Sequence, residues 1–179
     1  MSSPFTISPL ANLDYIPYVD DRGKFPEQFS KQIGVYAIFD ENKILQLVHY
    51  SRDIYLSLKQ HMVRQPQACY WVKAYVIEKP NRSHLEQIKE AWIAENDSIP
   101  QGNGEAFSQW TDPIDAKVSM TDEEKETYEK SDELGQMKLL KNVARRVQAE
   151  ILERLEPRNI QDSFRFNPKL KEKGLLDLK

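Results

Sequence analysis

The run Gly34-Val-Tyr-Ala-Ile-Phe39, followed by Ile44-Leu-Gln-Leu-Val48, decides the fold of this 179-residue chain. Both runs are short and rich in β-branched and aromatic residues, a composition that favours strands. The residues between them, Asp40-Glu-Asn-Lys43, are polar turn formers. The sequence therefore predicts a hairpin of two antiparallel strands.

Two helices and a third strand are predicted after this hairpin. Ser51 to Val63 carries apolar residues at helical spacing, with Ser51 as the expected N-cap. Cys69 to Ile77 is predicted to be the third strand, and a second helix is expected between Pro80 and Pro100. The predicted fold class is α/β, of the α+β type, with a small three-stranded antiparallel sheet flanked by helices.

The rest of the chain is expected to form extensions of this domain. The predicted order is an extended N-terminal arm (1–32), the α/β domain (33–103), a linker (104–120), a long C-terminal helix (121–157) and a tail (158–179). The arm is predicted because its prolines and apolar residues follow no helical or strand period. The long helix is predicted because Thr121-Asp-Glu-Glu124 forms a capping box ahead of an apolar stripe.

The composition excludes several classes of protein. A net charge of -3 and a pI near 5.7 exclude the overall positive field of most nucleic-acid binders, so any such binding requires a local patch. The single cysteine, Cys69, excludes an internal disulfide and a zinc site made of several thiolates. No run approaches about 18 apolar residues and the first ten residues lack a signal pattern, so a cytoplasmic protein without a membrane span is expected.

The order of these elements and the residues within them resemble the GIY-YIG nuclease superfamily. Gly34-Val35-Tyr36 stands where that family has its first motif, and Leu47-Val48-His49 stands at the second motif, with a poorer match. His61 matches a frequent histidine at the end of the first helix, and Glu86 falls where the family keeps a metal-binding glutamate. Asn103 matches the family's closing asparagine.

Within this superfamily, Leu45 to Asn103 is similar to the GIY-YIG-like N-terminal domain of the two-domain chloroplast monothiol glutaredoxins. This similarity rests on Ser51-Arg52, His61, Pro66, Cys69, Val72-Lys73 and Pro100-Gln-Gly-Asn103. The glutaredoxin half, with its active-site cysteine motif, is absent from this sequence.

The resemblance implies a metal-dependent nuclease site with parts missing. Tyr36 would help to activate the nucleophile, and Glu86 would hold one Mg²⁺ or Mn²⁺ ion. The family's helix arginine falls on Ser57, and the tyrosine of the second motif falls on Leu47. Because the loss of one charge-stabilising donor typically costs about 10²–10³ in rate, these two losses predict a weak or inactive endonuclease.

Three basic side chains are candidate substitutes for the missing arginine. They are Arg52, Arg64 and Lys73, which lie on or beside the first helix and the third strand. By the same resemblance, His61 and Asn103 are candidate binding residues.

Several of these residues also have a purely structural interpretation. Tyr36 alone is typical of a core aromatic in a strand, and Glu86 alone of a solvated helix charge. Lys138, Lys141 and Arg145 on the long helix are candidate phosphate contacts, but such charge runs usually form solvated helix faces.

Three functions therefore stay open. The first is a weak GIY-YIG endonuclease, and the second is a module that kept the fold but binds nucleic acid or a protein without catalysis. The third is an assembly factor that acts through the long helix, with a protein partner or a second copy of itself. Residues 33–103 contain eight lysines and arginines and eight aspartates and glutamates, so DNA binding is expected to be weak.

Overall fold

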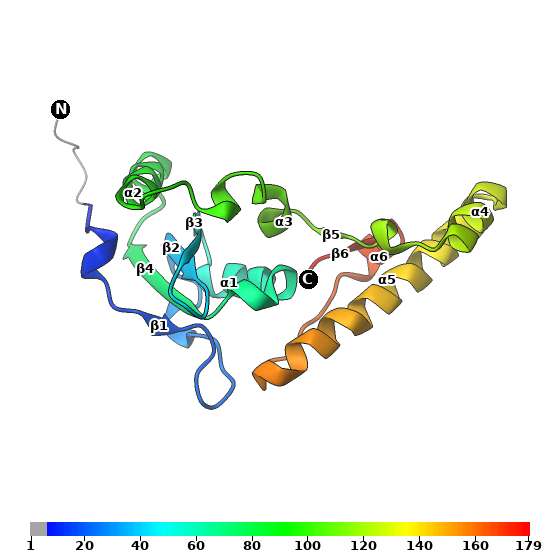
Figure 1. Cartoon of the computed structure of the whole chain (residues 1–179), viewed down its shortest axis with the longest axis horizontal. Helices are drawn as coiled ribbons and strands as arrows, with labels where there is room; N and C mark the ends of the chain where they lie inside the picture. Colours follow the sequence, from blue (N-terminus) through cyan, green and yellow to red (C-terminus); the bar gives the residue numbers. More distant parts are fainter. Residues whose placement is uncertain (1–6) are drawn as a thin grey trace. The chain divides into compact units, whose positions relative to one another are not determined.

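Figure 1 shows the computed structural model of the chain, which describes residues 7–179. The first six residues of the predicted N-terminal arm lie outside this range. The chain divides into two compact units, one ending at Thr111 and the other running from Asp112 to Lys179. Across the described range, no helix is long and apolar enough to cross a membrane.

The first unit is built on an antiparallel sheet of four strands in the order β1-β4-β2-β3. The predicted hairpin is present as β2 (Ile33–Phe39) and β3 (Leu45–Ser51), and the predicted third strand as β4 (Trp71–Ile77). The mixed α/β class is thus confirmed. The sheet has four strands rather than three because part of the N-terminal arm, β1 (Ile16–Pro17), pairs with the open edge of β4.

One helix covers each face of this sheet. α1 (Ile54–Arg64) lies on the face of the sheet that carries Tyr36. α2 (Arg82–Glu95) packs on the opposite face, which carries Val35. Successive residues of a strand point to opposite faces, so β2 is buried at every position after Ile33.

Side-chain caps begin both helices. Asp53 caps α1 by accepting the Leu56 amide, and Asn81 caps α2 by accepting the His84 amide. The predicted cap, Ser51, instead accepts the Asp53 amide, because the helix begins two residues further along.

Gly34 in the first motif is required by the close approach of β4. A Cβ atom at this position would lie 2.2 Å from the Tyr75 carbonyl oxygen, which is far inside van der Waals contact. The glycine of Gly34-Val35-Tyr36 therefore has a packing reason of its own, and β4 can lie directly against β2.

The second unit holds the long C-terminal helix. Its elements are β5 (Ile114–Asp115), α4 (Asp122–Lys130), α5 (Glu133–Leu155), α6 (Pro168–Lys171) and β6 (Leu175–Leu176), with β5 and β6 paired. The predicted helix over 121–157 is divided in two, because Asp132 caps a new helix at α5. The apolar stripe of α5 packs on α6, β6 and a short 3-10 helix of the same unit.

The predicted linker over 104–120 is structured. It contains α3 (Phe107–Thr111), which belongs to the first unit, and β5, which belongs to the second. Short 3-10 helices lie at Leu10–Asn12, Glu27–Phe29, Pro66–Ala68, Gln101–Asn103, Ala116–Ser119 and Glu156–Arg158.

Candidate functional site

Tyr36 lies in the middle of β2, opposite His49 on β3 and Ala74 on β4. Residues opposite each other in a sheet share a face, and the face of Tyr36 is the one covered by α1. The phenol oxygen lies 2.7 Å from Nε2 of His61 on α1. Only 1% of Tyr36 is exposed, so the phenol is sealed inside the unit.

The direction of this hydrogen bond follows from the second partner of His61. Nδ1 of His61 lies 2.8 Å from the backbone carbonyl oxygen of Trp110, which can only accept a hydrogen bond. Nδ1 therefore carries the proton, Nε2 carries the lone pair, and the Tyr36 hydroxyl donates to Nε2. Arg64 donates to the same Trp110 carbonyl at 3.0 Å.

The environment keeps both members of this pair neutral. Burial raises the pKa of Tyr36, with smaller opposing effects from the Ser57 hydroxyl and the Arg64 charge. Burial also lowers the pKa of His61 to about 3, and the nearby Arg64 charge adds to this effect. An acid–base catalyst works best with a pKa near the working pH, so this pair is better suited to holding structure than to moving protons.

Ser57 occupies the position at which the family resemblance expects an arginine. Its hydroxyl donates to Ser51 at 2.7 Å, and Ser51 donates in turn to the Asp53 carbonyl at 2.9 Å. This corner of the site is thus filled by small neutral hydroxyl groups rather than by a fixed positive charge.

Glu86 belongs to a second cluster, at the edge of the sheet. Tyr50 donates to a Glu86 carboxylate oxygen at 2.6 Å, and the Lys89 ammonium lies 3.7 Å from the other oxygen. The Tyr50 hydrogen bond, more than the Lys89 charge, lowers the pKa of Glu86. Tyr50 lies opposite Val35, on the other face from Tyr36. The structure therefore gives Tyr36 and Glu86 separate sets of partners.

The surroundings of Glu86 fit a divalent ion poorly. Tyr50 and Lys89 already bind the carboxylate, and the ammonium group opposes a second cation beside it. In residues 7–179, no three histidine, cysteine, aspartate or glutamate side chains cluster in a way that could hold a metal. The Mg²⁺ or Mn²⁺ ion expected from the resemblance remains a prediction.

The His49 ring lies near Tyr36, which bonds to His61, and also near Tyr50, which bonds to Glu86. Its ring centroid lies 6.4 Å from that of Tyr36, 5.4 Å from Tyr50 and 5.9 Å from Phe107 on α3. Burial, followed by the Lys89 charge, lowers the pKa of His49. Its Nδ1 atom is buried and has no hydrogen-bond partner within the described part of the chain.

The three candidate substitutes for the missing arginine occupy different places. Arg52 is exposed and lines a pocket of about 330 Å³ at the start of α2. Lys73 is buried and opposite Ala37, on the face away from Tyr36, and donates to the Leu10 carbonyl at 3.1 Å. Of the three, Arg64 is the one whose charge affects the pKa of Tyr36, which it lowers against the larger opposing effect of burial.

Asn103 has a structural role that the structure makes plain. Its side-chain oxygen accepts the Val48 amide and its side-chain nitrogen donates to the Val48 carbonyl, both at 2.8 Å. The amide group thus pairs with β3 as another strand would. Cys69 is buried as well, with its sulfur 3.7 Å from the His61 carbonyl oxygen.

The basic residues predicted on the long helix lie in the second unit. Lys138 and Arg145 are exposed on α5, and Lys141 lies 3.6 Å from the Glu172 carboxylate. A phosphate-binding role for these three residues remains a prediction.

Phe107 and Trp110 were not predicted as site residues, because both fall within the stretch predicted as a linker. A helix of five residues is too short to show a period, so no pattern indicated that α3 is there. The signal available was Trp110 itself, since a residue this large and apolar is highly buried on average.

Comparison with known proteins gives one partial similarity. No family model matches the chain. The chain is 36% identical over 74 residues to the bifunctional monothiol glutaredoxin-S16, chloroplastic, of Arabidopsis thaliana. The match covers 39% of this chain and 25% of the Arabidopsis protein, so the chain spans about a quarter of that relative's length. The expected similarity to a chloroplast monothiol glutaredoxin is thus confirmed over part of the chain, and the GIY-YIG assignment stays a resemblance.

Proposed function

We propose that the first unit is a degenerate domain of the GIY-YIG nuclease superfamily, which keeps the fold but no longer cleaves nucleic acid efficiently. One observation supports this most directly. Tyr36, which the resemblance makes the activator of the nucleophile, is buried from solvent and donates a hydrogen bond to His61. A group that activates water must come within hydrogen-bond reach of it.

The charges around this site favour the same conclusion. Phosphodiester cleavage needs fixed positive charge against the phosphoryl oxygens. At the expected arginine position, Ser57 bonds to another serine, and Glu86 is shared between Tyr50 and Lys89. The second candidate, a working endonuclease, would have to draw its charge from Arg64, which is bonded to a backbone carbonyl.

The redox function in the name of the Arabidopsis relative is not carried over to this chain. A reactive thiol needs an accessible thiolate, and Cys69 is the only cysteine and is buried. Because the match covers only a quarter of that relative, it supports a shared domain and does not support the activity of the whole relative.

A binding role for the same domain is favoured by what is left exposed near the site. Phe107 is 41% exposed, and its ring lies 5.9 Å from that of His49, whose pKa the Lys89 charge helps to lower. An exposed aromatic on a domain that also carries basic side chains fits weak, sequence-independent contact with single-stranded nucleic acid. Such binding should be weak and should fall as salt is added, because it would depend on phosphate contacts from scattered lysines and arginines.

The decisive experiment is plasmid nicking with Mg²⁺ or Mn²⁺ by the wild-type protein, Tyr36→Phe and Glu86→Ala. We expect no metal-dependent nicking above background from any of the three. Metal-dependent nicking that either substitution abolishes would restore a working nuclease. Fluorescence anisotropy with single-stranded DNA, using Phe107→Ala against the wild type at two salt concentrations, separately tests the binding role.

A further inference from the structure

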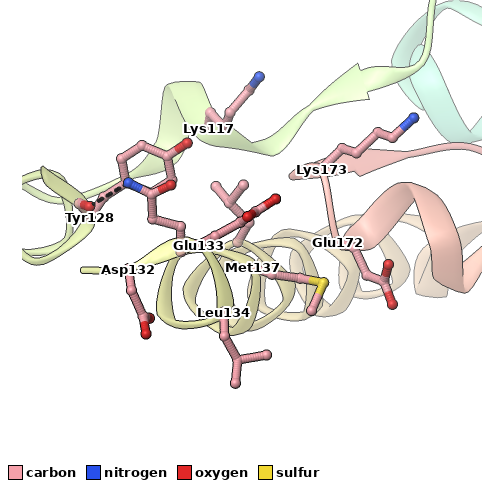
Figure 2. A pocket seen from close by; sticks show the side chains of 10 residues that line it. Lys117, Tyr128, Asp132, Glu133, Leu134, Met137, Glu172 and Lys173 are labelled. Carbon is pink, nitrogen blue, oxygen red and sulfur yellow. Dashed lines mark hydrogen bonds between the residues drawn. The ribbon is translucent and has the colours of Figure 1, made fainter.

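The second unit carries an open groove of about 820 Å³ at the start of α5 (Figure 2). Met137 and Leu140 contribute apolar surface to it, and Leu134 is 54% exposed, which is high for a leucine in the first turn of a long helix. Exposed apolar surface of this kind, rimmed by charge, is typical of an interaction site.

The groove carries opposite charges on its two sides. Figure 2 shows the amino groups of Lys117 and Lys173 on one side, and the α5 side with Asp132 and Glu133 on the other. Glu172, which precedes Lys173 and also lines the groove, lies 3.6 Å from the ammonium group of Lys141. Among residues 7–179, neither Lys173 nor Glu133 takes part in an ion pair, and Lys117 reaches only Asp115, at 4.0 Å. Both rims are thus available to a partner.

We propose that a second copy of this chain docks on this groove, with the two copies related by a two-fold axis. In such an interface the same patch serves both partners, so a residue on one side meets its counterpart from the other side. A groove with a basic and an acidic rim is complementary to itself under this symmetry. Glu133 of each copy then faces Lys173 of the second copy, and the two Leu134 side chains lie in the shared apolar centre.

The apolar centre and the charged rims have different tasks in this dimer. Exposed ion pairs contribute little affinity by themselves, so the apolar contact of Leu134 and Met137 supplies most of it. The charges set the orientation and exclude the arrangement in which like charges meet. Substitutions at the rim should therefore weaken the dimer, whereas substitution of Leu134 should abolish it.

Charge reversal in the full chain tests the orientation. Sedimentation velocity over a range of concentrations should show a dimer for the wild type, and Glu133→Lys and Lys173→Glu should each raise the dissociation constant about tenfold. The double variant Glu133→Lys/Lys173→Glu, and an equimolar mixture of the two single variants, should both recover dimers. The controls Glu153→Lys and Lys125→Glu, which lie outside the groove, should leave the constant unchanged.

Substitution of leucines on the same helix tests the apolar contact. Leu134→Gln should give a monomer with an unchanged circular dichroism spectrum, while Leu152→Gln, exposed on α5 but outside the groove, should remain dimeric. A wild-type chain that is monomeric at every concentration overturns the proposal and leaves the groove to a different partner. A double charge variant that stays as weak as the single variants overturns it as well.

Discussion

At Tyr36, one hydrogen bond makes a residue that the GIY-YIG resemblance predicts to be catalytic into a part of the core. A buried hydroxyl is costly unless it is paired, and the His61 lone pair satisfies it. His61 is satisfied in turn by the Trp110 carbonyl. The three groups are thus mutually dependent, and the loss of any one leaves a buried polar atom unpaired.

The neutral state of His61 predicts a pH dependence of stability. The pKa of His61 is about 3 in the folded protein and near 6.5 in the unfolded chain. Between these values the unfolded chain binds the proton more readily, so the free energy of unfolding should fall as the pH is lowered from about 6.5. One such group contributes a slope of up to about 1.4 kcal/mol per pH unit. Urea unfolding at a series of pH values measures it.

Two substitutions separate the contribution of His61 from that of His49, whose pKa is also lowered. The slope should shrink in His61→Gln by more than in His49→Gln, because His61 is the more deeply buried of the two. If the slope is the same in the wild type and in His61→Gln, then His61 is not held neutral by the fold.

The sequence could place Tyr36 on a strand and His61 on a helix, but it could not predict that they bond to each other. The motif order placed each on its element, and both positions are as expected. The acceptor that fixes the His61 tautomer is a backbone carbonyl 49 residues further along the chain. No side-chain pattern encodes a backbone carbonyl, so this part of the site required the structure.

Among the elements, α4 depends on polar contacts because none of its residues is buried. Thr121 and Glu124 form the predicted capping box at its start. Glu124 also accepts two hydrogen bonds from Arg146 of α5, at 2.9 and 2.8 Å, and Arg146 donates to the Ser119 carbonyl. This arrangement joins the start of α4 to the middle of α5.

Removal of Arg146 should therefore release α4 and leave α5 intact. In Arg146→Gln, we expect faster amide hydrogen exchange throughout α4 and a stability loss of about 1 kcal/mol or less, since the pair is solvent-exposed. Arg146, followed by the Thr121 amide, lowers the pKa of Glu124 to about 2. The wild-type contact should then be complete above about pH 4.5 and be lost as the pH falls towards 2.

The matched control is Lys130→Gln, which removes an exposed pair with Glu126 within α4 itself. It should change the exchange rates of α4 only slightly, because such pairs contribute a few tenths of a kcal/mol. If Arg146→Gln behaved like Lys130→Gln, the contact between the two helices would not hold α4 in place.

The longer elements could be predicted from sequence, and the shortest could not. β2 and β3 follow from runs rich in β-branched and aromatic residues, α1 and α2 follow from apolar residues at helical spacing, and these elements and β4 lie close to their predicted places. β1 has two residues and α3 has five, and both form because an existing surface accepts them, namely the open edge of β4 and the end of α1. A local pattern carries no information about such surfaces.

For the whole molecule, the boundary of the first unit lies eight residues beyond the predicted one, at Thr111 rather than Asn103. The prediction ended the domain at the last family-like residue. The structure extends it because Trp110 is only 2% exposed and its carbonyl accepts from both His61 and Arg64. α3 therefore completes the core of the first unit.

This boundary predicts that chains ending at Thr111 and at Asn103 differ sharply in stability. The shorter chain loses the buried Trp110 ring, a change that costs about 3–5 kcal/mol, and leaves His61 without its acceptor, at about 1–3 kcal/mol more. Since a domain has only about 5–15 kcal/mol of stability, the shorter chain should be largely unfolded at 25 °C or close to it.

Urea unfolding followed by tryptophan fluorescence and circular dichroism should show a cooperative transition for the longer chain. In the full chain, Trp110→Ala keeps the carbonyl but removes the ring, so its transition should fall between the two. Equal midpoints for the chains ending at Thr111 and Asn103 would mean that α3 is dispensable and that the predicted boundary was the right one.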